Sequence, residues 1–220
     1  MPEAIEIARE LIRRSDVMIE SFAAGAIHRL GLSFDDVRKL NPGLIKISTC
    51  LMGQTGPAAK LAGYGYHAGA IAGFYEITGW PDLPPSGPWV AYTDTIAPRF
   101  ISILLAAALD HRRRTGEGCY VDVAQIETSL HFLTPELLDL QLNGVAATRI
   151  GNRSTRVAPQ GCYRCAGEDR WCAIGVDTDD QWQRLAREIG REDLAADPAL
   201  GSHAGRLAAH DRIDAVITAW

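Results

Sequence analysis

The first half of the chain alternates between two hydrophobic patterns, and this alternation is the strongest constraint on its fold. Residues 2–14 place apolar side chains at spacings of three, four and seven, which is typical of an amphipathic helix. A short apolar strand is predicted at residues 16–21, a capped helix begins after Ser33, and a second strand follows at residues 44–50. Helix, strand, helix and strand in this order favour a parallel α/β sheet with right-handed crossovers.

A long apolar helix and a third strand extend this pattern. The helix is predicted over about residues 99–114, with Pro98 in its first turn, and its apolar composition indicates a buried core helix. A glycine-containing turn ends it, and residues 119–123 form the next predicted strand. The helix predicted after this strand, residues 126–140, contains Pro135, which we expect to bend or divide it.

The sequence changes in character in its second half. Residues 1–142 are interpreted as part of a large α/β domain, an incomplete Rossmann-like parallel sheet. Residues 143–161 contain several glycines and prolines and are predicted to be a connector. Residues 162–220 combine a β-hairpin with two helices, at residues 179–189 and about 204–220, and are expected to begin a smaller α+β domain.

The composition excludes several classes of protein. With 47% hydrophobic and 22% charged residues among 220, the chain is typical of a globular protein. Its net charge of −5 argues against nucleic-acid binding, which needs a concentrated basic surface. The apolar run at residues 100–109 is too short to span a bilayer, so no membrane association is expected. Five cysteines without a dense framework favour a reducing, cytoplasmic location.

One acidic residue, Asp94, lies just before the long helix. A carboxylate at this position can cap the helix by accepting a hydrogen bond from a backbone amide. It can also act as a nucleophile, because an aspartate is ionised at neutral pH without a paired base and a helix N-terminus stabilises negative charge. The local sequence alone favours the capping interpretation, and the two roles are compatible.

Short motifs elsewhere in the chain bear on this choice, because they occur in a characteristic order between residues 15 and 176. They are residues 16–22 (DVMIESF), 25–32 (GAIHRLGL), 41–45 (NPGLI), 53–57 (GQTGP), 114–118 (RTGEG) and 121–123 (VDV). Each motif is weak by itself, but together they resemble the family III CoA-transferases, also called CaiB/BaiF-like proteins. This family includes formyl-CoA, carnitine-CoA and benzylsuccinate CoA-transferases, with α-methylacyl-CoA racemase as a more distant relative.

The resemblance implies an acyl-CoA:carboxylate CoA-transferase in which Asp94 is the catalytic nucleophile. The aspartate would form first a mixed anhydride and then an aspartyl-CoA thioester, and a carboxylate suits this route because every intermediate stays near the energy of a thioester. No metal and no fixed cofactor are expected, since CoA is itself a substrate and product. The large domain, residues 1–142, would bind CoA through Ser21, Phe22, Arg29, Gly53, Gln54 and Tyr64, with Arg29 at a phosphate.

The chain departs from the family pattern at positions that bear on the reaction. Tyr64 occupies the position of the racemase histidine, so the racemase or epimerase alternative lacks one member of its acid–base pair. His67, one helical turn further on, is a candidate for a substrate-binding role, although a packing histidine is the favoured interpretation. Ser21 replaces an asparagine and offers fewer hydrogen-bonding groups to CoA.

Arg153, in the predicted connector, is a second candidate for binding a substrate carboxylate, with an exposed charged linker as the favoured alternative. Members of the family form interlinked homodimers, so a homodimer is expected, with acyl-CoA and a carboxylic acid acceptor as the small-molecule partners. Family members also carry a further N-terminal strand–helix unit and a long C-terminal segment, so we expect this chain to represent the middle of a longer protein. An inactive fragment that serves only as a dimerisation module is a third alternative.

Three cysteines in the predicted hairpin raise the question of a zinc site. Cys162, Cys165 and Cys172 would supply three ligands, but a fourth at a suitable spacing is missing. The period of a strand also places Cys162 and Cys165 on opposite faces. We therefore interpret them as strand cysteines without a metal.

Overall fold

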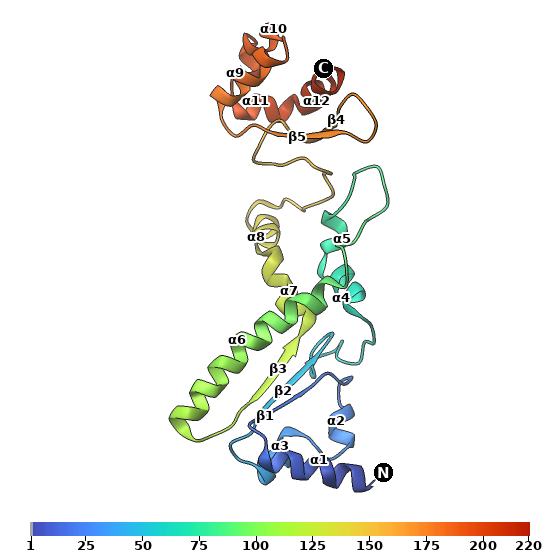
Figure 1. Cartoon of the computed structure of the whole chain (residues 1–220), viewed down its shortest axis with the longest axis vertical. Helices are drawn as coiled ribbons and strands as arrows, with labels where there is room; N and C mark the ends of the chain where they lie inside the picture. The colour runs from blue at the N-terminus through green and yellow to red at the C-terminus, as the bar shows by residue number, and fades with distance from the viewer. Residues whose placement is uncertain (1) are drawn as a thin grey trace. The chain divides into compact units, whose positions relative to one another are not determined.

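The computed structural model describes residues 2–220, which divide into two compact units (Figure 1). The first unit contains the chain up to Thr78 and then Pro85–Thr148. The second unit contains the short segment Gly79–Pro84 and then Arg149–Trp220. That the short segment belongs with the second unit was not indicated by the sequence.

The first unit contains a three-stranded parallel sheet. Its strands are β1 (Val17–Glu20), β2 (Ile45–Cys50) and β3 (Tyr120–Ala124). The central strand β2 is hydrogen-bonded to β1 on one side and to β3 on the other. This confirms the α/β fold with a parallel sheet that the alternating pattern predicted. The register aligns Glu20, Ser48 and Asp122 in one row across the three strands, close to their carboxyl ends.

Helices pack on both faces of this sheet. The long helix α6 (Tyr92–Thr115) lies along one face (Figure 1). Its Ile101 and Leu105 pack against the cluster that contains Ile45 and Ile47 of β2. Both β2 isoleucines are fully buried there. Because side chains alternate along a strand, the residues between them point to the opposite face.

The opposite face of the sheet meets the three helices at the start of the chain. These are α1 (Pro2–Arg14), α2 (Ala26–Arg29) and α3 (Phe34–Leu40). Ser33 caps α3 through a reciprocal pair of hydrogen bonds with Asp36, as its sequence predicted. Lys46 of β2 is fully buried on this side, where its Nζ donates to the carbonyl of Leu32 over 3.1 Å. An apolar cluster surrounds these helices and includes Ile12, Ile27, Leu32, Val37 and Leu44.

Helix α6 begins earlier than its sequence predicted. It starts at Tyr92 rather than near residue 99, so Pro98 lies inside the helix and not in its first turn. The prediction gave proline too much weight as a helix start. Pro98 removes one intrahelical hydrogen bond, to the carbonyl of Asp94, and tertiary contacts hold the preceding turn in place: the Tyr92 ring packs edge-to-face on Phe74 at 5.2 Å.

The prediction that α6 is a buried core helix was correct for one side of the helix only. Ile96, Ala97 and Ala108 are buried, but Ile103 on the outer side is 67% exposed. By length and composition alone, α6 is the one helix among residues 2–220 that could cross a membrane. Its inner side packs against the parallel sheet, which is the position of a helix layer in an α/β fold.

The remaining helices of the first unit lie before α6 and after β3. They are α4 (Gly65–Ala72), α5 (Phe74–Ile77), α7 (Gln125–Leu130), the short 3₁₀ helix η1 (His131–Leu133) and α8 (Thr134–Asn143). The helix predicted over residues 126–140 is therefore divided, as expected from Pro135, which lies in the first turn of α8.

The second unit is a small α+β structure with its own core. The predicted hairpin is present as β4 (Gln160–Arg164) and β5 (Trp171–Gly175), which pair antiparallel. The helical part comprises α9 (Asp179–Glu188), α10 (Glu192–Ala195), the 3₁₀ helix η2 (Pro198–Leu200), α11 (His203–Ala208) and α12 (His210–Ala219). The helix predicted over residues 204–220 is thus divided at Ala209. Trp182, Leu200 and Ile213 are fully buried in the core of this unit.

Candidate functional site

Asp94 is the third residue of α6, in the first turn of the helix. Ala91, and not Asp94, occupies the N-cap position, and the backbone N–H of Asp94 donates to the Ala91 carbonyl over 3.0 Å. The capping interpretation of Asp94 is therefore wrong, because the helix begins at Tyr92, before Asp94, and not near residue 99. The side chain is exposed, and its carboxylate makes no hydrogen bond or ion pair with any of residues 2–220.

The Asp94 carboxylate lies directly against Gly65, the first residue of α4. A Cβ built on Gly65 would lie 2.6 Å from Asp94 Oδ2 and 2.9 Å from the Ala91 Cβ, so a side chain at this position would displace the carboxylate. The first backbone amides of a helix have no partner within the helix, and the helix dipole favours a negative charge at that end. The Asp94 carboxylate therefore lies at the end of α4 toward which the positive pole of the helix dipole points.

Thr93 connects this turn to both neighbouring elements. Its side chain is fully buried, and its hydroxyl lies 3.1 Å from the carbonyl oxygen of Gly65 and 3.3 Å from Oε1 of Gln125. Gln125 is the first residue after β3. Asp94 is thereby held next to the carboxyl end of the parallel sheet, where ligands bind in open α/β folds.

The two loops predicted to bind CoA meet at the same end of the sheet. The backbone N–H of Gly25 donates to Oε1 of Gln54 over 3.1 Å, and the backbone N–H of Gln54 donates to Oδ2 of Asp122 over 2.8 Å. The loop that contains Ser21 and Phe22 is thus joined to the loop that contains Gln54. The structure thus brings together the two loops that carry Ser21, Phe22, Gly53 and Gln54, four of the residues predicted to bind CoA.

Arg29, the predicted phosphate ligand, ends the short helix α2 beside these loops. A Cβ built on Gly25 would lie 3.7 Å from Nη1 of Arg29, which places the guanidinium over the start of α2. The side chain is exposed and forms no ion pair in the described part of the chain. Its charge is therefore available to an anionic ligand.

Tyr64 and His67 lie at the start of α4, on either side of Gly65 in the sequence. Tyr64 is 76% exposed, and its ring centroid is 6.1 Å from that of His67. The backbone N–H of Tyr64 donates to Nδ1 of His67 over 3.1 Å, so this histidine satisfies an amide at the start of α4. The structure gives His67 a role in supporting the segment against which Asp94 lies.

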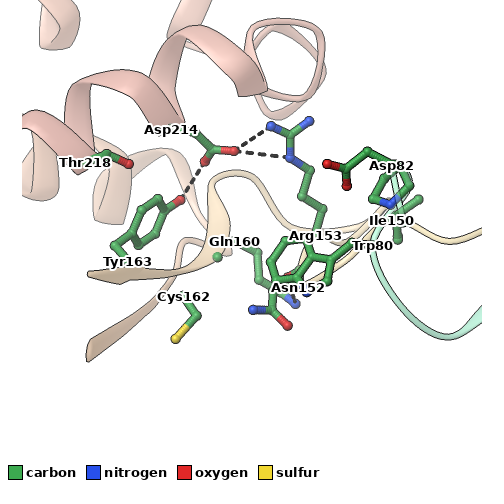
Figure 2. Close-up of a pocket in the computed structure, with 12 residues that line it drawn as sticks. Trp80, Asp82, Ile150, Asn152, Arg153, Gln160, Cys162, Tyr163, Asp214 and Thr218 are labelled. Atoms are coloured by element: carbon green, nitrogen blue, oxygen red, sulfur yellow. Dashed lines mark hydrogen bonds and ion pairs between the residues drawn. The ribbon is translucent and has the colours of Figure 1, made fainter. Parts of the chain in front are cut away.

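Arg153 belongs to the second unit and lines a cavity of about 470 Å³ (Figure 2). Its guanidinium pairs with both Asp211 and Asp214 at 2.6 Å, and the Tyr163 hydroxyl donates to Asp214 over 2.7 Å. Burial raises the pKa of the Tyr163 phenol, and the hydrogen bond to Asp214 raises it further. A substrate carboxylate at Arg153 would compete with two carboxylates that this residue already binds. The loop residue Trp80 lines the same cavity.

Several residues that build the site were not singled out from the sequence. Gly65 was not singled out, and Asp122 was noted only as part of the motif at residues 121–123. No local sequence pattern marked Thr93 or Gln125 as part of a site, because their importance comes from a contact between segments 32 residues apart. The strand period does place Asp122 on the face opposite to Val123, but it does not show which loop the carboxylate meets.

Comparison with known proteins identifies the group to which the chain is related. Its 220 residues match the family model of CoA-transferase family III over residues 1–220. The chain is 34% identical over 219 residues to a succinyl-CoA–D-citramalate CoA-transferase of Chloroflexus aurantiacus, covering 100% of this chain and 54% of that protein. It is 34% identical over 209 residues to an acetyl-CoA:oxalate CoA-transferase of Acetobacter aceti, covering 94% and 53% of the two chains.

A solved structure agrees with these sequence matches. The crystal structure of a CaiB/BaiF family protein from Brucella suis superposes with a TM-score of 0.87 at 29% identity, covering 100% of this chain and 57% of that one. The chain thus spans about half the length of the relatives that it matches.

Fold and site together define an α/β protein with a candidate ligand site at the carboxyl end of a parallel sheet. With the family match over the whole chain, the assignment becomes specific: the chain belongs to CoA-transferase family III.

Proposed function

We propose that the protein of which this chain is part transfers coenzyme A between a CoA thioester and a free carboxylic acid, with Asp94 as the nucleophile. The observation that carries the proposal is the exposed, unpaired Asp94 carboxylate held against the start of α4. The named relatives, which act between succinyl-CoA and D-citramalate or between acetyl-CoA and oxalate, support a carboxylic acid as acceptor.

The proposed reaction needs no oxidant, and Asp94 is regenerated at its end. The Asp94 carboxylate attacks the thioester carbonyl, the carbon–sulfur bond breaks, and CoA leaves as a thiolate while the acyl group stays on Asp94 as a mixed anhydride. The thiolate then attacks the aspartyl carbonyl, which releases the donor acid and leaves an aspartyl-CoA thioester. The acceptor carboxylate attacks this thioester, and the released thiolate attacks the acceptor's acyl carbon to give the new acyl-CoA.

The geometry supports a role for α4 in the steps that develop negative charge. The first residue of α4, Gly65, lies beside the Asp94 carboxylate, so the positive end of the α4 dipole would favour the oxyanion that forms on attack at or by this carboxylate. CoA would lie along Ser21, Phe22, Gly53, Gln54 and Tyr64, with Arg29 at a phosphate. His67 and Arg153 stay candidates for a substrate-binding role.

Trapping of the covalent intermediate tests the proposal. Incubation with succinyl-CoA followed by hydroxylamine should convert Asp94 to a hydroxamate, which mass spectrometry of the peptide that contains it detects. Asp94→Ala should abolish the product. It should change the free energy of unfolding by less than about 0.5 kcal/mol, because the exposed carboxylate has no partner to lose. A hydroxamate on any other residue would refute Asp94 as the nucleophile.

A further inference from the structure

We propose that Asp122 and Gln54 form a relay of hydrogen bonds that positions the two loops expected to hold CoA. The loops are residues 21–25, after β1, and residues 53–57, after β2. The inference rests on the proposed function for its ligand, while the relay itself is a property of the folded chain. Asp122 and Gln54 are therefore assigned as positioning residues.

The first link of the relay runs from β3 to the second loop. Oδ2 of Asp122 accepts the backbone N–H of Gln54 over 2.8 Å, across 68 positions in the sequence. The loop passes close over the end of β3 at this point. A Cβ built on Gly53 would lie 3.4 Å from the Ala124 Cβ, and the backbone there has a φ of +79°, which favours glycine.

The second link runs from Gln54 to the first loop. Its side-chain oxygen accepts the backbone N–H of Gly25 over 3.1 Å, and its Nε2 lies 3.8 Å from the Cys50 sulfur. The Gly25 amide fixes which end of the side-chain amide is the oxygen, since only the oxygen can accept. Gly25 immediately precedes α2, so the relay also sets the position from which Arg29 projects.

The first loop is held independently at its other end. The buried carboxylate of Glu20 accepts the backbone N–H of Phe22 over 2.9 Å and the hydroxyl of Ser48. With both Phe22 and Gly25 fixed, the loop has little freedom left to lose when a ligand binds. A loop that is already ordered binds more tightly because less conformational entropy is lost on binding.

The position of Asp122 argues that the relay serves a ligand and not the core. Its side chain is exposed, and in the described part of the chain its carboxylate makes one hydrogen bond, to the Gln54 amide. No apolar packing depends on it. The Asp122 carboxylate thus holds a loop in place at the carboxyl end of the sheet.

Hydrogen exchange and CoA binding on the full 220-residue chain test the relay. Asp122→Ala should increase amide exchange in residues 53–57 and 21–25 by about five- to tenfold, whereas Gln54→Ala should do so only in residues 21–25. Both variants should raise the Kd for coenzyme A by about five- to tenfold. Asp122→Asn keeps an acceptor oxygen and should restore both measurements. Glu117→Ala removes an exposed acid at the other end of β3 and is the matched control.

Each result bears on a separate part of the inference. Unchanged exchange of residues 21–25 in Asp122→Ala would overturn the relay. Faster exchange with an unchanged Kd for coenzyme A would show that the relay does not position the CoA loops. If the wild-type chain bound no coenzyme A, the ligand role of the relay would be contradicted, and the exchange data would still decide whether the relay itself exists. Hydroxylamine trapping decides the proposed function separately.

Discussion

At the scale of single residues, the site depends on what surrounds one carboxylate. Asp94 has no polar partner among residues 2–220, and a glycine lies where any other residue would push it away. An unpaired carboxylate is a better nucleophile than one in a salt bridge, because its lone pairs are not shared with a donor. Gly65 is thus as important to the placement of Asp94 as the helix that carries it.

Gly65→Ala should impair the reaction without unfolding the chain. Its Cβ would displace the Asp94 carboxylate, and a displacement of about 1 Å at a reacting atom can slow chemistry by about 100-fold. We expect hydroxylamine-trapped adduct to form about 100-fold more slowly than in the wild type, as measured by a time course of the labelled peptide.

The control for this substitution lies in the same helix. Gly69→Ala adds the same methyl group to α4, but its Cβ would lie 3.6 Å from Tyr75, an ordinary contact distance. Gly69→Ala should gain up to about 1 kcal/mol from the higher helix propensity of alanine, whereas in Gly65→Ala the close approach to the Ala91 Cβ opposes this gain. Equal rates of adduct formation in the two variants would contradict the role assigned to Gly65.

At the scale of elements, the sheet has one apolar and one partly polar face. Ile45 and Ile47 face α6, whereas Lys46 and Ser48 face the helices at the start of the chain. Lys46 satisfies its charge with the Leu32 carbonyl and with the Tyr120 ring, whose centroid is 5.4 Å from Nζ. A fully buried ammonium without a carboxylate bound directly to it is costly, which leads to a prediction on stability.

Lys46 should make stability depend on alkaline pH. Burial lowers the pKa of its ammonium below the ordinary value of 10.5, against an opposing attraction by Glu20. Between the lowered pKa and 10.5, the unfolded chain binds a proton that the folded chain does not, so stability rises with pH. The free energy of unfolding of the wild type, minus that of Lys46→Met, should therefore increase as pH rises from 7 towards 10.5.

Urea unfolding at a series of pH values measures this difference. Lys39→Met removes a lysine from the exposed side of α3 and controls for the loss of one positive charge. A difference between the wild type and Lys46→Met that stays constant across the alkaline range would contradict the prediction.

At the scale of the whole molecule, the chain covers about half of its relatives and leaves apolar surface uncovered. Ile103 on α6 is 67% exposed and Leu142 on α8 is 78% exposed. The homodimer expected from the family resemblance would cover apolar surface of this kind.

Self-association should depend on the outer side of α6. Sedimentation velocity should detect a dimer of the chain at micromolar concentration, and Ile103→Lys should shift it towards monomer by placing a charge on apolar surface. Glu117→Lys, beyond the end of α6, is the control and should leave the dimer unchanged. A chain that is monomeric at all concentrations, or a dimer insensitive to Ile103→Lys, would contradict this arrangement.

The fold of the first unit was largely predictable from the sequence because its signals are local. The period of residues 2–14, the cap at Ser33 and the apolar runs of β1 and β2 each report on a short segment. Pro98 was the exception, since its effect on the helix was outweighed by contacts of Tyr92 and Thr93 with distant segments. Contacts of that kind leave no trace in a local pattern.

The sequence by itself determined the parallel α/β order of elements, the family and Asp94 as the candidate nucleophile. It did so because hydrophobic period and motif order are properties of neighbouring residues. Only the tertiary structure decided what surrounds that aspartate: Gly65 against its carboxylate, and the relay from Asp122 through Gln54 to Gly25. These contacts join residues 29 to 68 positions apart, and the chain must fold before they exist.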